Sequence, residues 1–290
     1  MGGGSWTRDA FTSYASTSYS ASGLGSVTLD SLGAITNDVS NQDIFKSKTV
    51  DKALNPFEVM RECRDSEEHP NTIPVILSLD ITGSMGQAAV EVAKKLNVIM
   101  TKLYDQIKDV EFMIMGIGDL YCDRGPIQIS QFESDIRIAE QLDKIWFEFG
   151  GGGNFWESYS AAWYMGSRHC DLDCWKRGKK GIIITMGDER LNPYLPEEAL
   201  MLQTGDDLEA DVKTEDLYKE TSEKFDIYHI QVNHGNFWDK SNIDKSWEIL
   251  GDNYKEANMD NIADVIVDII VKANSEDSMV AGNTSDGISW

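Results

Sequence analysis

The order of apolar and polar positions divides the chain into a polar beginning and a long alternating remainder. Residues 1 to 45 are rich in Ser, Thr, Gly and Asn without clean periodicity, which predicts an arm that is extended or ordered only by docking. Residues 46 to 70 are charged and contain Asn55-Pro56, which indicates a lead-in with a short helix. Residues 71 to 275 form the predicted domain, and residues 276 to 290 a C-terminal tail.

Within the predicted domain, short apolar runs alternate with segments of helical periodicity. Pro74 to Asp80 is a continuous apolar run, as a central parallel strand buried on both faces requires, and apolar residues from Ala88 to Leu103 recur at helical spacing. Further strands are predicted over 110–117, 127–132, 181–185 and 225–232, and further helices over 136–147, 155–168, 196–224, 242–250 and 262–271. This alternation predicts the α/β class, with a Rossmann-like, doubly wound, mostly parallel sheet flanked by helices on both faces.

Three predicted loops place polar residues at the carboxyl ends of these strands, where open parallel sheets bind their ligands. The first is Asp80-Ile81-Thr82-Gly83-Ser84, which follows the first strand. The second is a glycine run that ends in Asn154, and the third is Gly187-Asp188-Glu189. Because the strands are predicted to be parallel, these loops should meet at one edge of the sheet.

The first loop has the composition that a hard cation requires. Mg²⁺ takes oxygen ligands in an octahedron and keeps some of its waters. One carboxylate (Asp80) and two hydroxyls (Thr82 and Ser84) at alternate positions can curl around such an ion, and Gly83 and Gly86 allow the tight turn. Hydroxyl ligands are neutral, so the ion would keep enough positive charge to bind an anionic oxygen from outside.

Asp-x-Thr-Gly-Ser between a buried strand and an amphipathic helix resembles the metal-ion-dependent adhesion site of the von Willebrand factor A family. The resemblance covers roughly residues 71 to 275. In that family the motif is Asp-x-Ser-x-Ser, with a Thr in a second loop and an Asp in a third. It implies that Asp80 holds the waters of the ion and that Thr82 and Ser84 are direct ligands. Mg²⁺ is the expected ion, with Mn²⁺ and Ca²⁺ as alternatives.

The second and third loops depart from the family pattern. Asn154 stands where the family has Thr, and Glu157, one turn further on, is an alternative ligand. In the third loop, Met186 stands where the family has its Asp. Asp188 shares the face of Met186 in an extended chain but lies roughly 6.6 Å further along. Asp188 is nevertheless the expected ligand, which requires this loop to have a shape of its own.

Composition narrows the class of partner. The chain has 26 basic and 49 acidic residues, a net charge of −23, and no basic cluster that suggests a groove for a phosphate backbone. Nucleic acid is therefore not an expected partner. The start of the chain resembles neither a secretory nor a myristoylation signal, and Asp264 and Asp268 interrupt the most apolar helix. A cytoplasmic protein without a membrane span is expected.

Several residues have simpler interpretations that stay open at this stage. Asp80 alone could be a helix cap. His169, Cys170 and Cys174 could be part of a zinc site, but no second pair completes it, and reduced structural thiols are the alternative. His229 lies inside an apolar strand and is expected to be a core histidine.

Two classes of function compete. As a binding module, the metal would accept an Asp or Glu side chain from another protein, and the family resemblance implies an adaptor or assembly factor of bacterial or phage type beside an AAA+ ATPase. As a serine hydrolase, Ser84 would be the nucleophile with His234 and Asp188, because Thr82 to Gly86 nearly matches a nucleophile elbow. A phosphatase that uses Asp80 would want an Asp where Thr82 stands, and no P-loop occurs. The binding module, which is not an enzyme, is the preferred reading.

Overall fold

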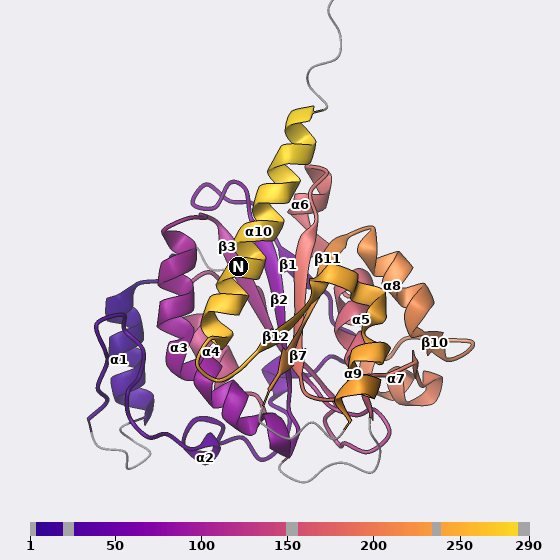
Figure 1. Ribbon diagram of the computed structural model, residues 1–290, viewed down its shortest axis with the longest axis horizontal. Helices are drawn as coiled ribbons and strands as arrows, with labels where there is room; N and C mark the ends of the chain where they lie inside the picture. The colour runs from indigo at the N-terminus through magenta and orange to yellow at the C-terminus, as the bar shows by residue number, and fades with distance from the viewer. Residues whose placement is uncertain (1–3, 20–25, 149–155, 234–238, 284–290) are drawn as a thin grey trace, which may run out of the picture.

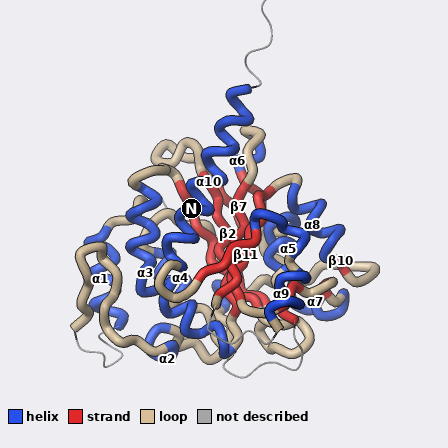
Figure 2. Tube along the Cα trace, in the orientation of Figure 1, coloured by secondary structure: helices blue, strands red, loops and turns tan. Residues whose placement is uncertain are grey.

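The computed structural model describes residues 4–19, 26–148, 156–233 and 239–283, with side chains in the last segment as far as Ser275. Its centre is a six-stranded sheet in the order β12-β11-β7-β2-β3-β4 (Figures 1 and 2). The strands are β2 (Ile73–Asp80), β3 (Val110–Ile117), β4 (Ile127–Ile129), β7 (Gly181–Gly187), β11 (Phe225–Val232) and β12 (Tyr254–Ala257). All of these neighbours pair in parallel except β4, which is antiparallel to β3.

Helices cover both faces of this sheet, so the predicted fold class is confirmed. One face carries α3 (Gly86–Tyr104) and α10 (Ile262–Asn283), with α4 (Arg137–Leu142) beside them. The other carries α5 (Ser160–Arg168) and α8 (Thr214–Ser222). Figure 1 shows α3 and α8 on opposite sides of the strands. Alternate residues of β2 supply the two cores, since Leu77 packs with the first group and Ile76 with the second.

Part of the N-terminal arm is helical rather than extended. Its helix α1 (Arg8–Tyr19) lies outside α3 (Figure 1), and a short α2 (Asn41–Ile44) follows. Phe11, Ala15 and Tyr19 are buried, and the indole of Trp6 donates to Asn97 of α3 over 3.0 Å. Phe11, Ala15 and Tyr19 form one stripe at spacings of four, and with Trp6 they dock the arm onto the domain.

Three pairs of short strands, none of them predicted, tie the loops together. The first pair is parallel and joins β1 (Arg61–Cys63), in the predicted lead-in, to β6 (Cys170–Leu172), which follows α5. Parallel β5 (Trp156–Glu157) and β8 (Arg190–Leu191) join the second and third loops at the carboxyl edge of the main sheet. The remaining pair, β9 (Tyr194–Leu195) and β10 (Val212–Lys213), is antiparallel.

Several predicted helices have different bounds. The segment 136–147 is helical only over α4, and 155–168 begins as strand β5 before α5. The acidic segment 196–224 divides into α7 (Glu197–Thr204), β10 and α8, and 242–250 becomes α9 (Lys240–Ser246) followed by a 3₁₀ helix (Glu248–Asn253). Two further short helices are a 3₁₀ turn (Lys52–Leu54) and α6 (Asp173–Lys176). Helix α10 continues through the predicted boundary at residue 275. No helix in the described ranges is long and apolar enough to cross a membrane.

The N-terminal edge of the main sheet is held by ion pairs. Asp65 accepts hydrogen bonds from the backbone N–H (3.0 Å) and hydroxyl (2.9 Å) of Thr72 and pairs with Arg177. Arg64 pairs with Asp171 and, over 3.1 Å, with Asp173. These contacts fix the loops that precede β2 and β7.

Candidate functional site

Asp80 is the last residue of β2 and is only 1% exposed. Its Oδ1 accepts two hydrogen bonds from Thr82, one from the backbone N–H (2.8 Å) and one from the hydroxyl (2.6 Å). This closes the loop into a tight turn that enters the 3₁₀ segment Gly83–Met85 and then α3. Because the Thr82 hydroxyl donates to Asp80, its oxygen lone pairs remain available to a cation.

The third loop meets the first through Asp188. The Ser84 hydroxyl donates to Asp188 Oδ1 over 3.2 Å and lies 3.4 Å from the Thr82 hydroxyl oxygen. Met186 is fully buried in the core, so it presents nothing at this edge. The structure therefore brings together Asp80, Thr82, Ser84 and Asp188, with Ser84 exposed and Asp188 half-buried at the mouth.

Tyr159 is a member of this site that the sequence did not reveal. Its hydroxyl donates to Asp80 Oδ2 over 2.7 Å and accepts the backbone N–H of Glu189 over 3.3 Å. A Cβ at Gly187 would lie 1.9 Å from that hydroxyl oxygen, so only glycine leaves room for the tyrosine. Both Asp80 oxygens are thus held in place, and Tyr159 links the first loop to the third.

Glu157 enters the same region from β5. It is 5% exposed, and its Oε2 has no hydrogen-bond partner among the described residues. In the β5–β8 pair, Trp156 lies opposite Arg190 and Glu157 lies opposite Leu191. Strand alternation sends Trp156 and Glu157 to opposite sides, which turns the carboxyl group of Glu157 inward.

The carboxyl groups of this site are held in unfavourable surroundings. Burial, and then the charge of Asp188, raises the pKa of Asp80 to about 7. Burial raises the pKa of Glu157 to about 11, and Asp80 is the largest charge that adds to the effect. Burial and then Asp188 likewise raise the pKa of Glu189 to about 7. In the described part of the chain no Lys or Arg forms an ion pair with Asp80 or Glu157.

The oxygen atoms fit a hard cation in spacing and in charge. Adjacent oxygens around an octahedral Mg²⁺ are about 2.9 Å apart, since each lies about 2.0–2.1 Å from the ion. The Thr82–Ser84 and Ser84–Asp188 oxygen pairs, at 3.4 and 3.2 Å, come close to that spacing. No three His, Cys, Asp or Glu side chains in the described ranges gather as a metal cluster. A cation here would depend on the two hydroxyls as well as the carboxylates.

Other predicted residues have different fates. Asn154 and His234 lie outside the described residues, so the second-loop ligand and the proposed hydrolase base stay predictions. His229 is a fully buried core histidine whose Nδ1 lies 2.9 Å from the Thr185 hydroxyl oxygen. It also stacks on Trp247 with ring centroids 3.5 Å apart. Among the described histidines, none contacts Ser84.

The zinc interpretation fails on geometry. Cys170 and Cys174 are buried and form no disulfide. The ring of His169 lies between the Val59 carbonyl oxygen (3.0 Å) and Asp206 Oδ2 (2.7 Å). Its two nitrogen atoms are therefore occupied by partners other than cysteine, and burial raises the pKa of Cys170 to about 12.

No protein-family model matches the chain, and no curated protein matches it. Among solved structures it is similar to the pilus adhesin SpaC from Lactobacillus rhamnosus GG in its open conformation (12% identity, TM-score 0.47, 70% of this chain and 30% of SpaC). It is also similar to the vWF domain of the type V pili tip protein Mfa5 from Porphyromonas gingivalis (12% identity, TM-score 0.46, 71% of this chain and 96% of the Mfa5 domain). A third similar structure is proximal thread matrix protein 1 from the mussel byssus (11% identity, TM-score 0.44, 70% of this chain and 48% of that protein). The chain spans less than a third of SpaC, and likeness of this order says nothing about what it binds.

Proposed function

We propose that this chain is a metal-dependent protein–protein interaction module of von Willebrand factor A type. Asp80, Thr82, Ser84 and Asp188 would hold a divalent ion, with Mg²⁺ preferred over Mn²⁺ or Ca²⁺. Asn154 would complete the ligand set from the second loop. The ion would supply a positive charge that accepts an Asp or Glu side chain of the partner, and the module would have no enzymatic role.

The main support is the pair of buried carboxyl groups, Asp80 and Glu157, without a cationic partner among the described residues. Burying a carboxylate without compensation is costly, and a bound cation removes that cost. The chain's own residues contribute orientation: Asp80 fixes the Thr82 hydroxyl, and Tyr159 fixes Asp80. The exposed Ser84 keeps the mouth of the site open to a partner side chain.

The proposed partner is defined by its chemistry, as a protein that presents an Asp or Glu side chain. An adaptor or assembly factor beside an AAA+ ATPase, in a bacterial or phage setting, is what the motif resemblance implies. The charge of −23 would repel an acidic partner at long range, but at physiological salt charges more than about 8 Å apart are largely screened. The local charge of the ion would therefore dominate at contact.

Metal dependence tests the proposal. Mg²⁺ at about a hundred times its Kd should stabilise the protein by about 2.7 kcal/mol, and raise the melting temperature by about 5–10 °C. Asp80→Ala should abolish the shift, and Asp80→Asn should do so with less disturbance of the loop. Thermal unfolding by circular dichroism, with EDTA as the baseline, gives the measurement.

A serine hydrolase would behave differently. Ser84 would then react with a fluorophosphonate whether or not EDTA is present. Such labelling, or a melting temperature indifferent to Mg²⁺ and Mn²⁺, would end the binding-module proposal.

A further inference from the structure

A pocket of about 620 Å³ lies beside the arm and the loop that joins β3 to β4. Lys46, Lys48 and Arg124 line it, with Trp146 and Glu148. The lining thus holds three cationic side chains and one carboxylate, on a chain whose net charge is −23. We call it the cationic pocket.

Neither lysine of the pocket forms an ion pair among the described residues, although Lys46 interacts electrostatically with Asp43 and Asp143. Both are exposed, and the Lys46 ammonium donates to the Ser18 carbonyl oxygen over 3.0 Å. Both ammonium groups are exposed to solvent, and Lys48 has no hydrogen bond or ion pair among the described residues, so an anion from outside can approach them.

Arg124 is held in position at the same pocket. Its guanidinium lies over the Trp146 ring at 5.2 Å, and its Nε donates to Glu148 Oε2 over 3.2 Å while the side chain stays 79% exposed. Glu148 also accepts the backbone N–H groups of Arg124 (2.7 Å) and Gly125 (2.9 Å). Glu148 is thus engaged by three donors, and it orients Arg124 with its outer N–H groups free to face a ligand.

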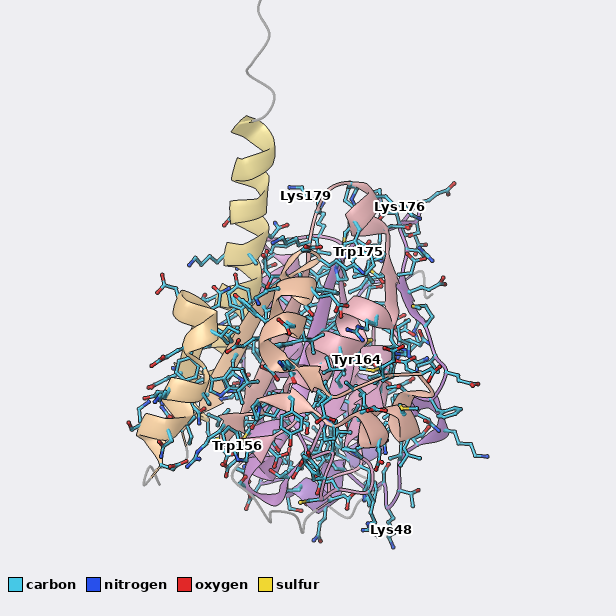
Figure 3. All side chains as sticks on the ribbon, turned by 90° about the vertical axis from the view of Figure 1, so that its right-hand side faces the viewer. Lys48, Trp156, Tyr164, Trp175, Lys176 and Lys179 are labelled. Carbon is cyan, nitrogen blue, oxygen red and sulfur yellow. The ribbon has the colours of Figure 1, made fainter. Side chains whose placement is uncertain are left out.

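The other basic region of the chain differs. The turn from Lys176 to Lys180 is a second cluster of basic residues, and it lies at the opposite end of the molecule from Lys48 (Figure 3). There Lys176 pairs with Asp173 (2.6 Å), Arg177 with Asp65 and Lys180 with Asp226 (3.7 Å). Those cations form ion pairs with carboxylates, whereas neither Lys46 nor Lys48 forms one among the described residues.

The cationic pocket and the candidate metal loops share one edge of the sheet. A Cβ at Gly118 would lie 2.3 Å from Asp123, next to Arg124, and 3.4 Å from Ile81, next to Asp80. Lys48 and Trp156, the neighbour of Glu157, lie at the same end of the molecule in Figure 3. A segment that crosses this edge could therefore meet both places.

We propose that the cationic pocket binds a second carboxylate side chain of the same acidic partner segment whose first carboxylate binds the metal. This inference rests on the proposed function only for the contact between the first carboxylate and the metal ion. Arg124 and the two lysines suit a carboxylate, and the charge of Glu148 in the lining disfavours a more highly charged phosphoryl group. Recognition would then need two acidic residues.

The test uses fluorescein-labelled hexaglutamate as the probe and fluorescence anisotropy as the readout, with the full chain in Mg²⁺ or in EDTA. Lys46→Glu/Lys48→Glu should weaken binding about tenfold under both conditions. Lys176→Glu/Lys180→Glu makes the same change in net charge at the opposite edge and should weaken it less than about twofold. Lys46→Gln/Lys48→Gln, a milder change, should lie between, and circular dichroism checks that each variant is folded.

The outcomes separate the two proposals. Equal losses in the two charge-reversal variants, with a response to Mg²⁺ intact, would overturn the pocket and leave the metal site standing. Loss in the pocket variant without any response to Mg²⁺ would overturn the metal site and leave the pocket. Displacement of hexaglutamate in EDTA by inorganic phosphate, at concentrations where acetate has no effect, would overturn the carboxylate assignment.

Discussion

At the N-terminal edge of the main sheet, Asp65, Asp171 and Asp173 lie within ion-pair distance of arginine, whereas at the carboxyl edge Asp80 and Glu157 face other carboxylates. The pKa values move in opposite directions. Hydrogen bonds from Lys176 and Arg64 lower the pKa of Asp173 to about 2, while burial and Asp188 raise that of Asp80 to about 7. The same residue type stabilises one edge and strains the other. Buried carboxyl groups that lack a cationic partner and have a raised pKa therefore distinguish the candidate site from the structural ion-pair network.

The largest contrast should come from one substitution made at each edge. Asp65→Asn should cost about 2 kcal/mol of unfolding free energy, because it turns an amide toward Arg177 and weakens the acceptor for the buried Thr72 groups. Asp80→Asn in EDTA should cost less, since it removes a buried charge that lacks a cation. Urea denaturation at neutral pH measures the unfolding free energies of both variants. A larger loss in Asp80→Asn than in Asp65→Asn would contradict the contrast between the two edges.

Glu157→Gln should separate folding from metal binding. Because the pKa of Glu157 is raised to about 11, its carboxyl group is protonated at neutral pH without a cation, and glutamine imitates that form. Stability in EDTA should change by less than about 0.5 kcal/mol. The affinity for Mg²⁺ should fall about tenfold, as when a group that supports metal ligands is lost. Calorimetric titration with Mg²⁺ measures it, and an unchanged affinity would remove Glu157 from the site.

The smallest expected effect is a pH dependence of stability at the N-terminal edge of the main sheet, where Asp173 forms ion pairs. The pKa of Asp173 in the folded state, about 2, lies below its ordinary value of 3.8. Its stabilising contribution is therefore present above about pH 4 and is lost as the pH falls toward 2. The stability difference between the wild type and Asp173→Asn should narrow over that interval in urea titrations. A difference independent of pH would mean that the ion pairs of Asp173 add little.

The sequence predicted the elements that burial alone specifies. β2, β3, β7 and β11 are apolar runs, and their predicted bounds agree with the structure to within about two residues. The two-residue strands β5 and β8 were missed because their pairing depends on tertiary contacts. Helix α1 was missed because Ser and Thr are weak helix formers, although Phe11, Ala15 and Tyr19 already formed a helical stripe.

The site was predictable where a motif is local. Asp80, Thr82 and Ser84 lie within five residues, so one turn brings them together. The third loop needed a shape of its own, and the contact between Ser84 and Asp188 shows that it has one. Tyr159 was not predictable, because its contact with Asp80 depends on the space that Gly187 leaves free. Whether the four oxygen ligands bind a metal ion stays a prediction.

The docking of the arm on α3 has a consequence for the order in which the chain is made. α3 is covered from outside by α1 and packs against α10, but α10 begins at Ile262, far along the chain from Gly86. At ribosomal rates of about 5–20 residues per second, that interval lasts roughly 10–35 s. The arm is translated before both helices, so Trp6 and Phe11 can cover the outer side of α3 during this interval. The arm can therefore cover α3 before the residues of α10 have been synthesised.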